Sequence, residues 1–433
     1  MACKSCQRVD RPWFGLWLWT VLVLTSGYAW GAEPPAARYL LGHAYKIPSQ
    51  YTNQESGYFA IIEGKNGRLY IGAAKYGVNA YLIEFDPKAE AMKMVVDVQK
   101  TIGSTATGFA AQSKIHTRNN VGTSGKIYFG SKQGYPEKNE KRTDYLGGYA
   151  FTYDPKTGKT EHFGIARQHH GIISITPDES RGIAYISTCS DTRPEHSHFM
   201  ILDLKKRTYR DLGDLGHMFA FIVLDCKDRA YHPIRCGQIA RYDPASDKLE
   251  RLSVTVDGAK APPELTKQDC ILNWDASPDR KTLYAVEMTT NQLFAFDMTA
   301  FGGTVPGRRL GELLPGGKKT DCRAMCVGQD GVVWACVTRH DLPEGVEPHL
   351  VSYHPGQKSP RDHGICAIAN PNYTPFTDSS GKLLPLHHAV RKTKDGTLIP
   401  WVPLGIAAAH DGSVYVFTLA PFTLLRFSPE VLR

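Results

Sequence analysis

One pattern recurs seven times along the chain, and it constrains the fold more than any other feature. Each copy has a short apolar segment that contains an aromatic residue, then a loop, then a second apolar segment that ends at Asp-Pro or a similar turn. Residues 126–130, residues 148–153 and the turn Asp154-Pro155 show the pattern most clearly. The aromatic anchors of the copies are Tyr70, Tyr128, Tyr185, Tyr231, Tyr284, Trp334 and Tyr415. Such self-similarity indicates one supersecondary unit used repeatedly.

The spacing of the anchors predicts the architecture. Successive anchors are 46 to 58 residues apart, except for the last two, which are 81 residues apart. A propeller blade of four antiparallel strands takes about 40–50 residues. We therefore predict an all-β fold, a seven-bladed β-propeller of four-stranded antiparallel blades, as one domain over residues 33–433. The long last interval predicts an inserted loop at residues 364–403. A strand within residues 39–47 is expected to complete the last blade and close the ring.

The first 32 residues differ in character from the rest. Lys4, Arg8 and Arg11 precede an apolar run at residues 16–28, and Ala29 and Gly31 are small residues of the kind found at cleavage sites. This pattern predicts a signal peptide over residues 1–32. The run is short beside the about 20 apolar residues of a membrane span, so we expect an exported, periplasmic or extracellular protein without a membrane span after signal removal. An uncleaved anchor is the alternative.

The net charge and the cysteine spacing limit which partners and cofactors we expect. The full chain carries a formal net charge of +8, which suits an acidic partner. Cys3 and Cys6 have haem-attachment spacing, but Gln7 stands where such a motif needs histidine. No phosphate-binding loop motif occurs. We expect no haem, no nucleotide and no nucleic-acid partner, and a monomer.

Loop lengths predict which face carries function. In a propeller, the loop that enters each inner strand and the loop after each anchor strand lie on one face. The long loops fall on that face, at residues 97–110, 131–146, 188–197, 255–269, 338–348 and 364–403. Long loops in compact domains are usually functional. We therefore assign function to this face, called the mouth face below.

The same rule brings polar side chains to the mouth of the central channel. Those at the starts of inner strands are His116, His170, His217, Asn273, Asp275 and Arg323. Those at the ends of anchor strands are Lys132, Arg235, Glu287, Arg339 and His340. A histidine in one inner strand is usually a core residue, but three at equivalent positions of consecutive blades indicate a shared role.

These residue types fit uronate β-elimination on an acidic polysaccharide. The reaction needs a cation to neutralise the carboxylate, a role suited to Arg323. It also needs a base near neutral pH, a role suited to His116 or His170. We take His116, His170, Lys132 and Arg323 as the catalytic candidates. The expected substrate-binding residues are His217, Arg235, Asn273, Asp275, Glu287, Arg339 and His340.

One blade also resembles a known family. Residues 114–132, KIHTRNNVGTSGKIYFGSK, resemble a blade of propeller polysaccharide lyases of the ulvan-lyase kind. The resemblance implies that an inner-strand histidine acts at the mouth, which His116 matches, and Lys132 stands where the family has a second histidine. Residues 175–205 and 273–288 look like a widespread group of exported bacterial propellers with no assigned activity.

Two other functions stay open. His116, His170 and His217 could ligate a divalent metal, with Asp275 or Glu287 completing the shell; propeller oligogalacturonate lyases, which have a His-rich manganese site, are similar in this respect. The third alternative is a non-catalytic module that binds a glycan or a protein. The absence of any strong catalytic motif in the sequence favours that alternative.

Overall fold

The computed structural model describes residues 38–53, 56–192, 194–217, 221–234, 237–267, 270–300, 302–385 and 390–433. The predicted signal peptide and Arg235 lie outside the described residues. Residues 38–433 form one compact unit. Within the described part of the chain, none of the helices is long and apolar enough to cross a membrane.

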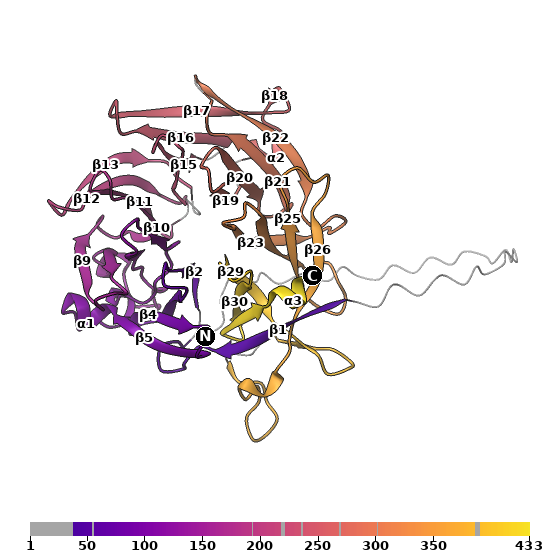
Figure 1. The fold of residues 1–433 in the computed structure, drawn as a ribbon. Helices are drawn as coiled ribbons and strands as arrows, with labels where there is room; N and C mark the ends of the chain where they lie inside the picture. Colours follow the sequence, from indigo (N-terminus) through magenta and orange to yellow (C-terminus); the bar gives the residue numbers. More distant parts are fainter. Residues whose placement is uncertain are drawn as a thin grey trace, which may run out of the picture. The chain divides into compact units, whose positions relative to one another are not determined.

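Seven four-stranded antiparallel blades form a ring, which confirms the predicted fold (Figure 1). Blade 1 contains β2 (Ser56–Glu63), β3 (Leu69–Lys75), β4 (Asn79–Asp86) and β5 (Ala91–Asp97). Blade 2 contains β6 (Asn120–Val121), β7 (Ile127–Gly130), β8 (Tyr149–Tyr153) and β9 (Thr160–Ile165). Blade 3 contains β10 (Gly171–Asp178), β11 (Ile183–Cys189), β12 (His198–Asp203) and β13 (Thr208–Asp214).

The second half of the ring repeats this order, from the innermost strand outward. Blade 4 contains β14 (Val223–Leu224), β15 (Ala230–Ile234), β16 (Gln238–Asp243) and β17 (Lys248–Val256), with β18 (Ala259–Lys260) paired to β17. Blade 5 contains β19 (Leu272–Ala276), β20 (Thr282–Glu287), β21 (Gln292–Asp297) and β22 (Thr304–Glu312). Blade 6 contains β23 (Thr320–Val327), β24 (Val333–Arg339), β25 (Glu347–Tyr353) and β26 (Arg361–Ile368). Blade 7 contains β29 (Trp401–Ala408), β30 (Val414–Ala420), β31 (Thr423–Phe427) and the N-terminal β1 (Tyr39–Lys46).

Strand β1 closes the ring, as predicted. Its second half pairs antiparallel with β31, with His43 opposite Arg426. Its first half pairs parallel with β26, with Tyr39 opposite Ile365. One strand therefore satisfies the outer edges of two blades, which leaves less open sheet edge at the junction.

The aromatic anchors are buried side chains that join strands within and between blades. All of them have 9% or less of their surface exposed. The hydroxyl of Tyr70 donates to Glu84 at 2.8 Å within blade 1, and that of Tyr128 donates to Glu179 at 2.9 Å on the next blade. Burying such a side chain stabilises the fold by roughly 1.5–3 kcal/mol. The hydroxyls of Tyr185 and Tyr415, in contrast, are buried without a hydrogen-bond partner among the described residues.

Two details differ from the prediction. Short helices α1 (Val98–Ile102), α2 (Pro263–Thr266) and α3 (Pro429–Leu432) are present, and α1 forms because Asp97 caps it at Lys100. The 3-10 turns are η1 (Gly108–Ala110), η2 (Arg142–Asp144) and η4 (Pro371–Tyr373). The insertion runs over residues 369–400, because β26 continues to Ile368 and β29 begins at Trp401; it contains β27 (Arg391–Lys392) and β28 (Leu398–Ile399).

The inner strand of blade 2 was expected to start at His116, but β6 starts only at Asn120 and is two residues long. The hydroxyl of Thr117 donates to the carbonyl of Gly130 at 2.5 Å and accepts from its amide at 2.9 Å. The Thr117 side chain thus replaces the backbone groups that would pair in a regular β-ladder, and regular strand pairing starts only at Asn120. His116 consequently lies in the irregular segment that precedes β6 rather than in a strand.

Candidate functional site

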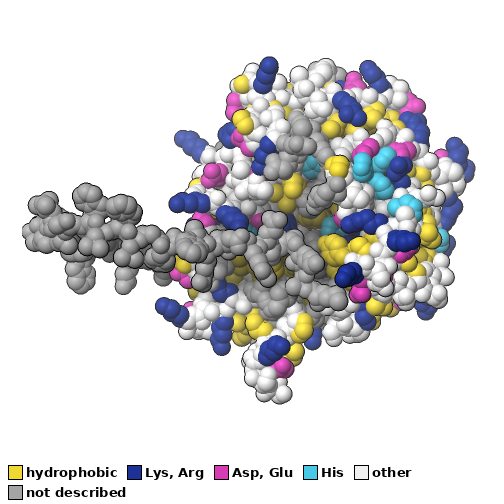
Figure 2. Space-filling view, turned by 180° about the vertical axis from the view of Figure 1, so that it is seen from behind, with side chains coloured by type: hydrophobic (Ala, Val, Ile, Leu, Met, Phe, Trp, Pro, Cys, Tyr) yellow, Lys and Arg dark blue, Asp and Glu magenta, His cyan; other side chains and the backbone are white. Residues whose placement is uncertain are grey.

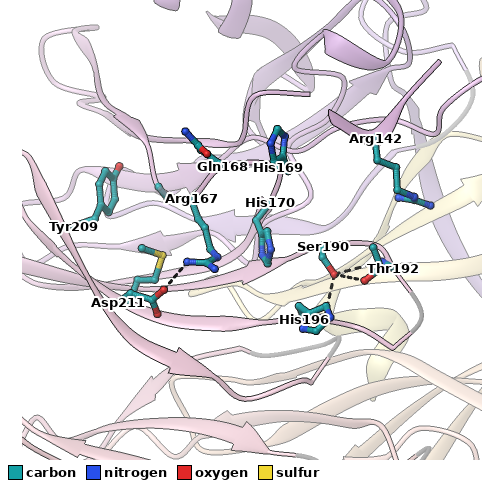
Figure 3. Close-up of a pocket in the computed structure, with 12 residues that line it drawn as sticks. Arg142, Arg167, Gln168, His169, His170, Ser190, Thr192, His196, Tyr209 and Asp211 are labelled. Carbon is teal, nitrogen blue, oxygen red and sulfur yellow. Dashed lines mark hydrogen bonds and ion pairs between the residues drawn. The ribbon is translucent and has the colours of Figure 1, made fainter. Parts of the chain in front are cut away.

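The first cavity lies on the mouth face, between blades 2 and 3, and measures about 690 Å³. Its walls come from the loop around η2, the β9–β10 connection and the β11–β12 loop, two of which are loops predicted to be functional. We call it the histidine pocket, and its polar lining consists of Arg142, Arg167, Gln168, His169, His170, Ser190, Thr192, His196, Tyr209 and Asp211 (Figure 3). Figure 2 shows histidine side chains gathered on one face beside lysine and arginine side chains.

The tight β9–β10 connection aims two histidines at this pocket. His169 has a left-handed backbone (φ 60°), and its Nδ1 lies 2.7 Å from the carbonyl oxygen of Tyr145. Because a carbonyl only accepts, Nδ1 of His169 carries the proton. Gly171 follows at a point where a Cβ would lie 2.2 Å from Cγ of Lys132, so only glycine fits there.

His170 stays neutral at pH 7. Burial lowers its pKa to about 4, and the positive charge of Arg167 and the ring of His198 act in the same direction. Its Nδ1 lies 3.0 Å from the hydroxyl of Thr188, and its ring meets that of His198 edge to face at 5.4 Å. The imidazole is therefore available for hydrogen bonding, but it is a weak base at neutral pH.

Most charges of the pocket compensate one another. Arg167 pairs with Asp211 at 2.6 Å, and His196 lies 2.5 Å from Asp214. His198 also contacts Asp211, at 2.8 Å. Arg142 is exposed and has no carboxylate within ion-pair distance among the described residues. The pocket thus presents one uncompensated guanidinium beside neutral or paired imidazoles.

The second cavity occupies the central channel and measures about 430 Å³. Its lining comes from the inner strands and from the residues just before them. The turns at the ends of inner strands also contribute, with Gly64, Gln329 and His410. Those turns lie on the face opposite the mouth, so the channel cavity extends to that face. Its polar lining includes Arg118, Asn119, Asn273, Asp275 and Arg323.

Three side-chain polar atoms of residues that line the channel cavity have no hydrogen-bond partner in the described part of the chain. Both amide atoms of Asn119, which is 1% exposed, lack a hydrogen bond, and so does Oδ1 of Asn273, which is 2% exposed. The Nδ2 atom of Asn273 donates to the carbonyl of Arg323 at 2.7 Å. Leaving a buried donor or acceptor unpaired costs about 1–3 kcal/mol, and such groups are rare in native proteins.

The structure distributes the predicted site residues over several environments. Asn273, Asp275 and Arg323 share the channel cavity, whereas His170 lines the histidine pocket. Lys132 is buried and pairs with Asp191 at 2.6 Å. Burial lowers the pKa of this lysine, but the carboxylate of Asp191 outweighs burial and raises it overall. Burial and the charges of Lys132 and Lys114 hold the pKa of His116 well below its usual value.

The remaining predicted residues have structural contacts. The ring of His217 accepts from the amide of Leu272 at 3.5 Å. Glu287 is fully buried, accepts from Thr289 and Thr290 at 2.8 Å and pairs with Lys267 at 3.2 Å. Arg339 pairs with Asp341 at 3.4 Å. Burial lowers the pKa of His340, whose amide donates to Lys319.

The three histidines considered as metal ligands do not form a cluster of ligand atoms in the described part of the chain. Within the described parts of the chain, the one group of three candidate ligand residues whose ligand atoms lie within 4.8 Å of one another is Cys189, Asp191 and Glu195. None of His116, His170 and His217 belongs to it. Glu195 accepts from the amide of Ser190 at 2.7 Å, and Asp191 binds Lys132, so these carboxylates already have protein partners.

Sequence reasoning missed several residues of the two cavities. Arg142 and Arg167 line the histidine pocket, and Arg118 and Asn119 line the channel cavity. Arg167 stands three residues before His170, and Arg118 and Asn119 directly follow the KIHT segment. Proximity to the predicted histidines was the available signal, but it does not tell which neighbouring side chain turns inward.

Comparisons with known proteins support the fold. No protein-family model and no curated protein matches the chain. Among solved structures, the periplasmic gluconolactonase PpgL of Pseudomonas aeruginosa matches with TM-score 0.52 and 14% identity, over 84% of this chain and 93% of that one. The propeller domain of Myceliophteria thermophila Cps50 (Swd1) matches with TM-score 0.52 and 10% identity, over 87% and 96% of the two chains.

A third match is longer than this chain. The extracellular domain of the putative hybrid two-component system BT4673 from B. thetaiotaomicron matches with TM-score 0.51 and 10% identity, over 89% of this chain. The aligned part spans 39% of that domain. At such identities the likeness shows a β-propeller fold alone, and the one-blade resemblance to polysaccharide lyases is supported only to that extent.

Proposed function

We propose that this protein is an exported propeller that binds an acidic saccharide in the histidine pocket without cleaving it. The observation that carries the proposal is the uncompensated guanidinium of Arg142 at the edge of a cavity of about 690 Å³. Small-molecule sites typically measure about 300–1,000 Å³. A carboxylate is the group that a free guanidinium binds best, through two parallel hydrogen bonds.

The rest of the lining suits a sugar ring. Gln168, Ser190 and Thr192 offer amide and hydroxyl groups, and Met200 and Tyr209 offer apolar surface. Sugar hydroxyls both donate and accept hydrogen bonds, so they match these side chains and the imidazoles between them. Export is proposed from the N-terminal segment, and the fold occurs in a periplasmic and an extracellular protein.

Binding is favoured over β-elimination because the elimination residues do not meet in one cavity. His170 lines the histidine pocket, whereas Arg323 lines the channel cavity. Lys132 is held by Asp191, and His116 is buried beside two lysines. His170 itself, with its pKa lowered to about 4, is a poor base for removing a carbon-bound proton at neutral pH.

The test is calorimetric binding of oligogalacturonate, alginate oligomers and neutral dextran oligomers. We expect acidic chains to bind more tightly than dextran. Arg142→Ala should lower the affinity for the acidic chains about tenfold, which corresponds to about 1.4 kcal/mol of binding free energy. Lys138→Ala, an exposed cation on the same loop that does not line the pocket, is the matched control and should bind like the parent protein.

Two results would contradict the proposal. Equal binding of dextran and acidic chains would remove the role of Arg142. Accumulation of unsaturated uronate products, followed by ultraviolet absorbance and abolished by His170→Ala, would show an eliminase instead of a binding module.

A further inference from the structure

We propose that the channel cavity is a second binding site, for a small uncharged polyhydroxylated molecule of monosaccharide or polyol size. It extends to the face opposite the histidine pocket and shares no lining residue with that pocket. The inference therefore does not depend on the proposed function.

The unpaired amides point to a ligand that both donates and accepts hydrogen bonds. Asn119 has an unpaired donor and an unpaired acceptor, Asn273 has an unpaired acceptor, and both residues belong to the lining of the same cavity. Hydroxyl groups satisfy both kinds of partner at once. A carboxylate or a phosphate could satisfy only the donor of Asn119 and would leave both amide oxygens unpaired.

The two arginines that line the cavity already have carboxylate partners, and Lys65, which also lines it, donates to the carbonyl of Thr123 at 2.7 Å. Arg118 forms an ion pair with Asp275 and also donates to the carbonyl of Trp274. Arg323 pairs with Asp321 at 2.8 Å. Each guanidinium is compensated, so an anion would meet two carboxylates and gain little from the arginines.

Apolar walls supply the remaining contact. The rings of Phe59 and Phe221 meet edge to face at 4.8 Å and line the cavity together with Met325 and Ile406. A sugar or cyclic polyol has C–H faces that pack on such rings while its hydroxyls reach the amides. The volume of about 430 Å³ falls within the range of small-molecule sites.

The residues on both sides of Asn119, and the amide of Asn273, are held in place before any ligand binds. The backbone amide of Arg118 donates to Ile173 at 2.9 Å, and the side-chain Nδ2 of Asn120 donates to Ile175 at 2.8 Å, so blade 3 fixes the neighbours of Asn119. The bond from Asn273 to the Arg323 carbonyl fixes the orientation of the second amide. Such preorganisation lowers the entropy cost of binding.

The experiment is calorimetric titration of the protein, expressed from its full sequence, with D-glucose, D-galactose and myo-inositol. At least one of these probes should bind saturably. Asn119→Leu removes both unpaired atoms and keeps a similar side-chain volume. It should lower the affinity for that probe at least tenfold. Asn139→Leu, the same change on an exposed mouth-face loop, should leave the affinity unchanged. If the leucine variant does not fold, Asn119→Ser replaces it, with the same expected loss.

D-glucuronate, the carboxylate counterpart of D-glucose, separates the two proposals. Its binding should survive Asn119→Leu, because the proposed function assigns it to the histidine pocket, and should weaken in Arg142→Ala. The channel proposal is overturned if no neutral probe binds, as expected of a cavity that holds water only. It is also overturned if Asn119→Leu and Asn119→Ser bind the neutral probe with the affinity of the parent protein. A third contradicting result would be that the Asn119 variants lose as much affinity for D-glucuronate as for the neutral probe.

Discussion

The histidine pocket and the channel cavity handle polar side chains in opposite ways. In the pocket, Arg167 and His196 pair with Asp211 and Asp214 at 2.6 and 2.5 Å. In the channel, both amide atoms of Asn119 have no partner although the residue is almost fully buried. The pocket is electrostatically nearly complete without a ligand, whereas the channel has hydrogen-bonding capacity left over.

This difference predicts which solution conditions and ligand properties should determine the binding affinity of each cavity. Ion pairs and imidazoles respond to salt and pH. Neutral amides respond to the shape and hydroxyl pattern of what fills the space. The pocket should therefore discriminate ligands by charge and the channel by hydrogen bonding, and the following variants test that contrast in order of expected effect.

Lys132→Met should have the largest effect. It leaves Asp191, whose side chain is 21% exposed, without its cation, in the loop that carries Ser190 and Thr192 of the histidine pocket. Breaking a buried pair costs about 3–5 kcal/mol, so the free energy of unfolding in urea should fall by about that amount. Binding of acidic saccharide should weaken with it. Adding Asp191→Asn, which suits the left-handed backbone at that position (φ 55°), should recover much of the loss. A fully stable single variant would refute the importance of the pair.

Arg118→Met should act on the channel alone. The change removes the partner of Asp275, and both side chains are largely buried, at 17% and 19% exposure. Leaving the carboxylate without its cation should cost about 1–3 kcal/mol in urea unfolding. Acidic-saccharide binding should not change. Loss of that binding in Arg118→Met would mean that the two cavities are coupled, and Arg118→Lys serves as the charge-preserving control.

Lowering the pH should strengthen only the histidine pocket. The folded pKa of His170, about 4, lies below its unfolded value of 6.5. Its contribution to stability is therefore present above pH 6.5 and is lost as pH falls toward 4. An anionic ligand favours the protonated ring, so affinity for oligogalacturonate should rise several-fold from pH 7 to pH 5. His170→Asn should flatten this rise, and a neutral probe of the channel should bind equally at both pH values. If the affinity of His170→Asn rose by the same factor from pH 7 to pH 5, groups other than His170 would be responsible for the pH dependence.

Lys159→Ala should have the smallest effect and sets the baseline for both regions. Lys159 and Glu161 pair at 3.0 Å on the outer edge of blade 2, with 71% and 35% of their side chains exposed. Exposed pairs contribute about 0–1 kcal/mol. Unfolding in urea and both kinds of binding should match the parent protein, and any larger change would show that the assays report general damage.

The architecture could be predicted because its signal is local and repeated. Each blade carries its own aromatic anchor at a near-constant interval, and turns such as Asp154-Pro155 mark the strand ends. Closure by β1 followed from the two visible strands of the last repeat. The inner strand expected to start at His116 starts instead at Asn120, because the hydroxyl of Thr117 replaces backbone pairing, which the residue pattern does not reveal.

The candidate site was harder to predict than the fold. Asn273, Asp275 and Arg323 were expected at the mouth of the channel, and they line the channel cavity, which reaches the turns of the opposite face. His170 was expected to join them but lies in the other cavity, because the tight turn at His169 aims it toward the β11–β12 loop. Lys132 was expected at the mouth as a catalytic candidate, and it is buried and pairs with Asp191.

By itself the sequence determined the number of blades, their strand order and the strand that closes the ring, since each depends on short-range periodicity and on chain connectivity. Only the tertiary structure decided which polar side chains share a cavity and which neutralise one another. Arg118 and Asp275 come from blades far apart in the chain, and contacts of that kind depend on side-chain direction and burial, which leave no mark in residue spacing.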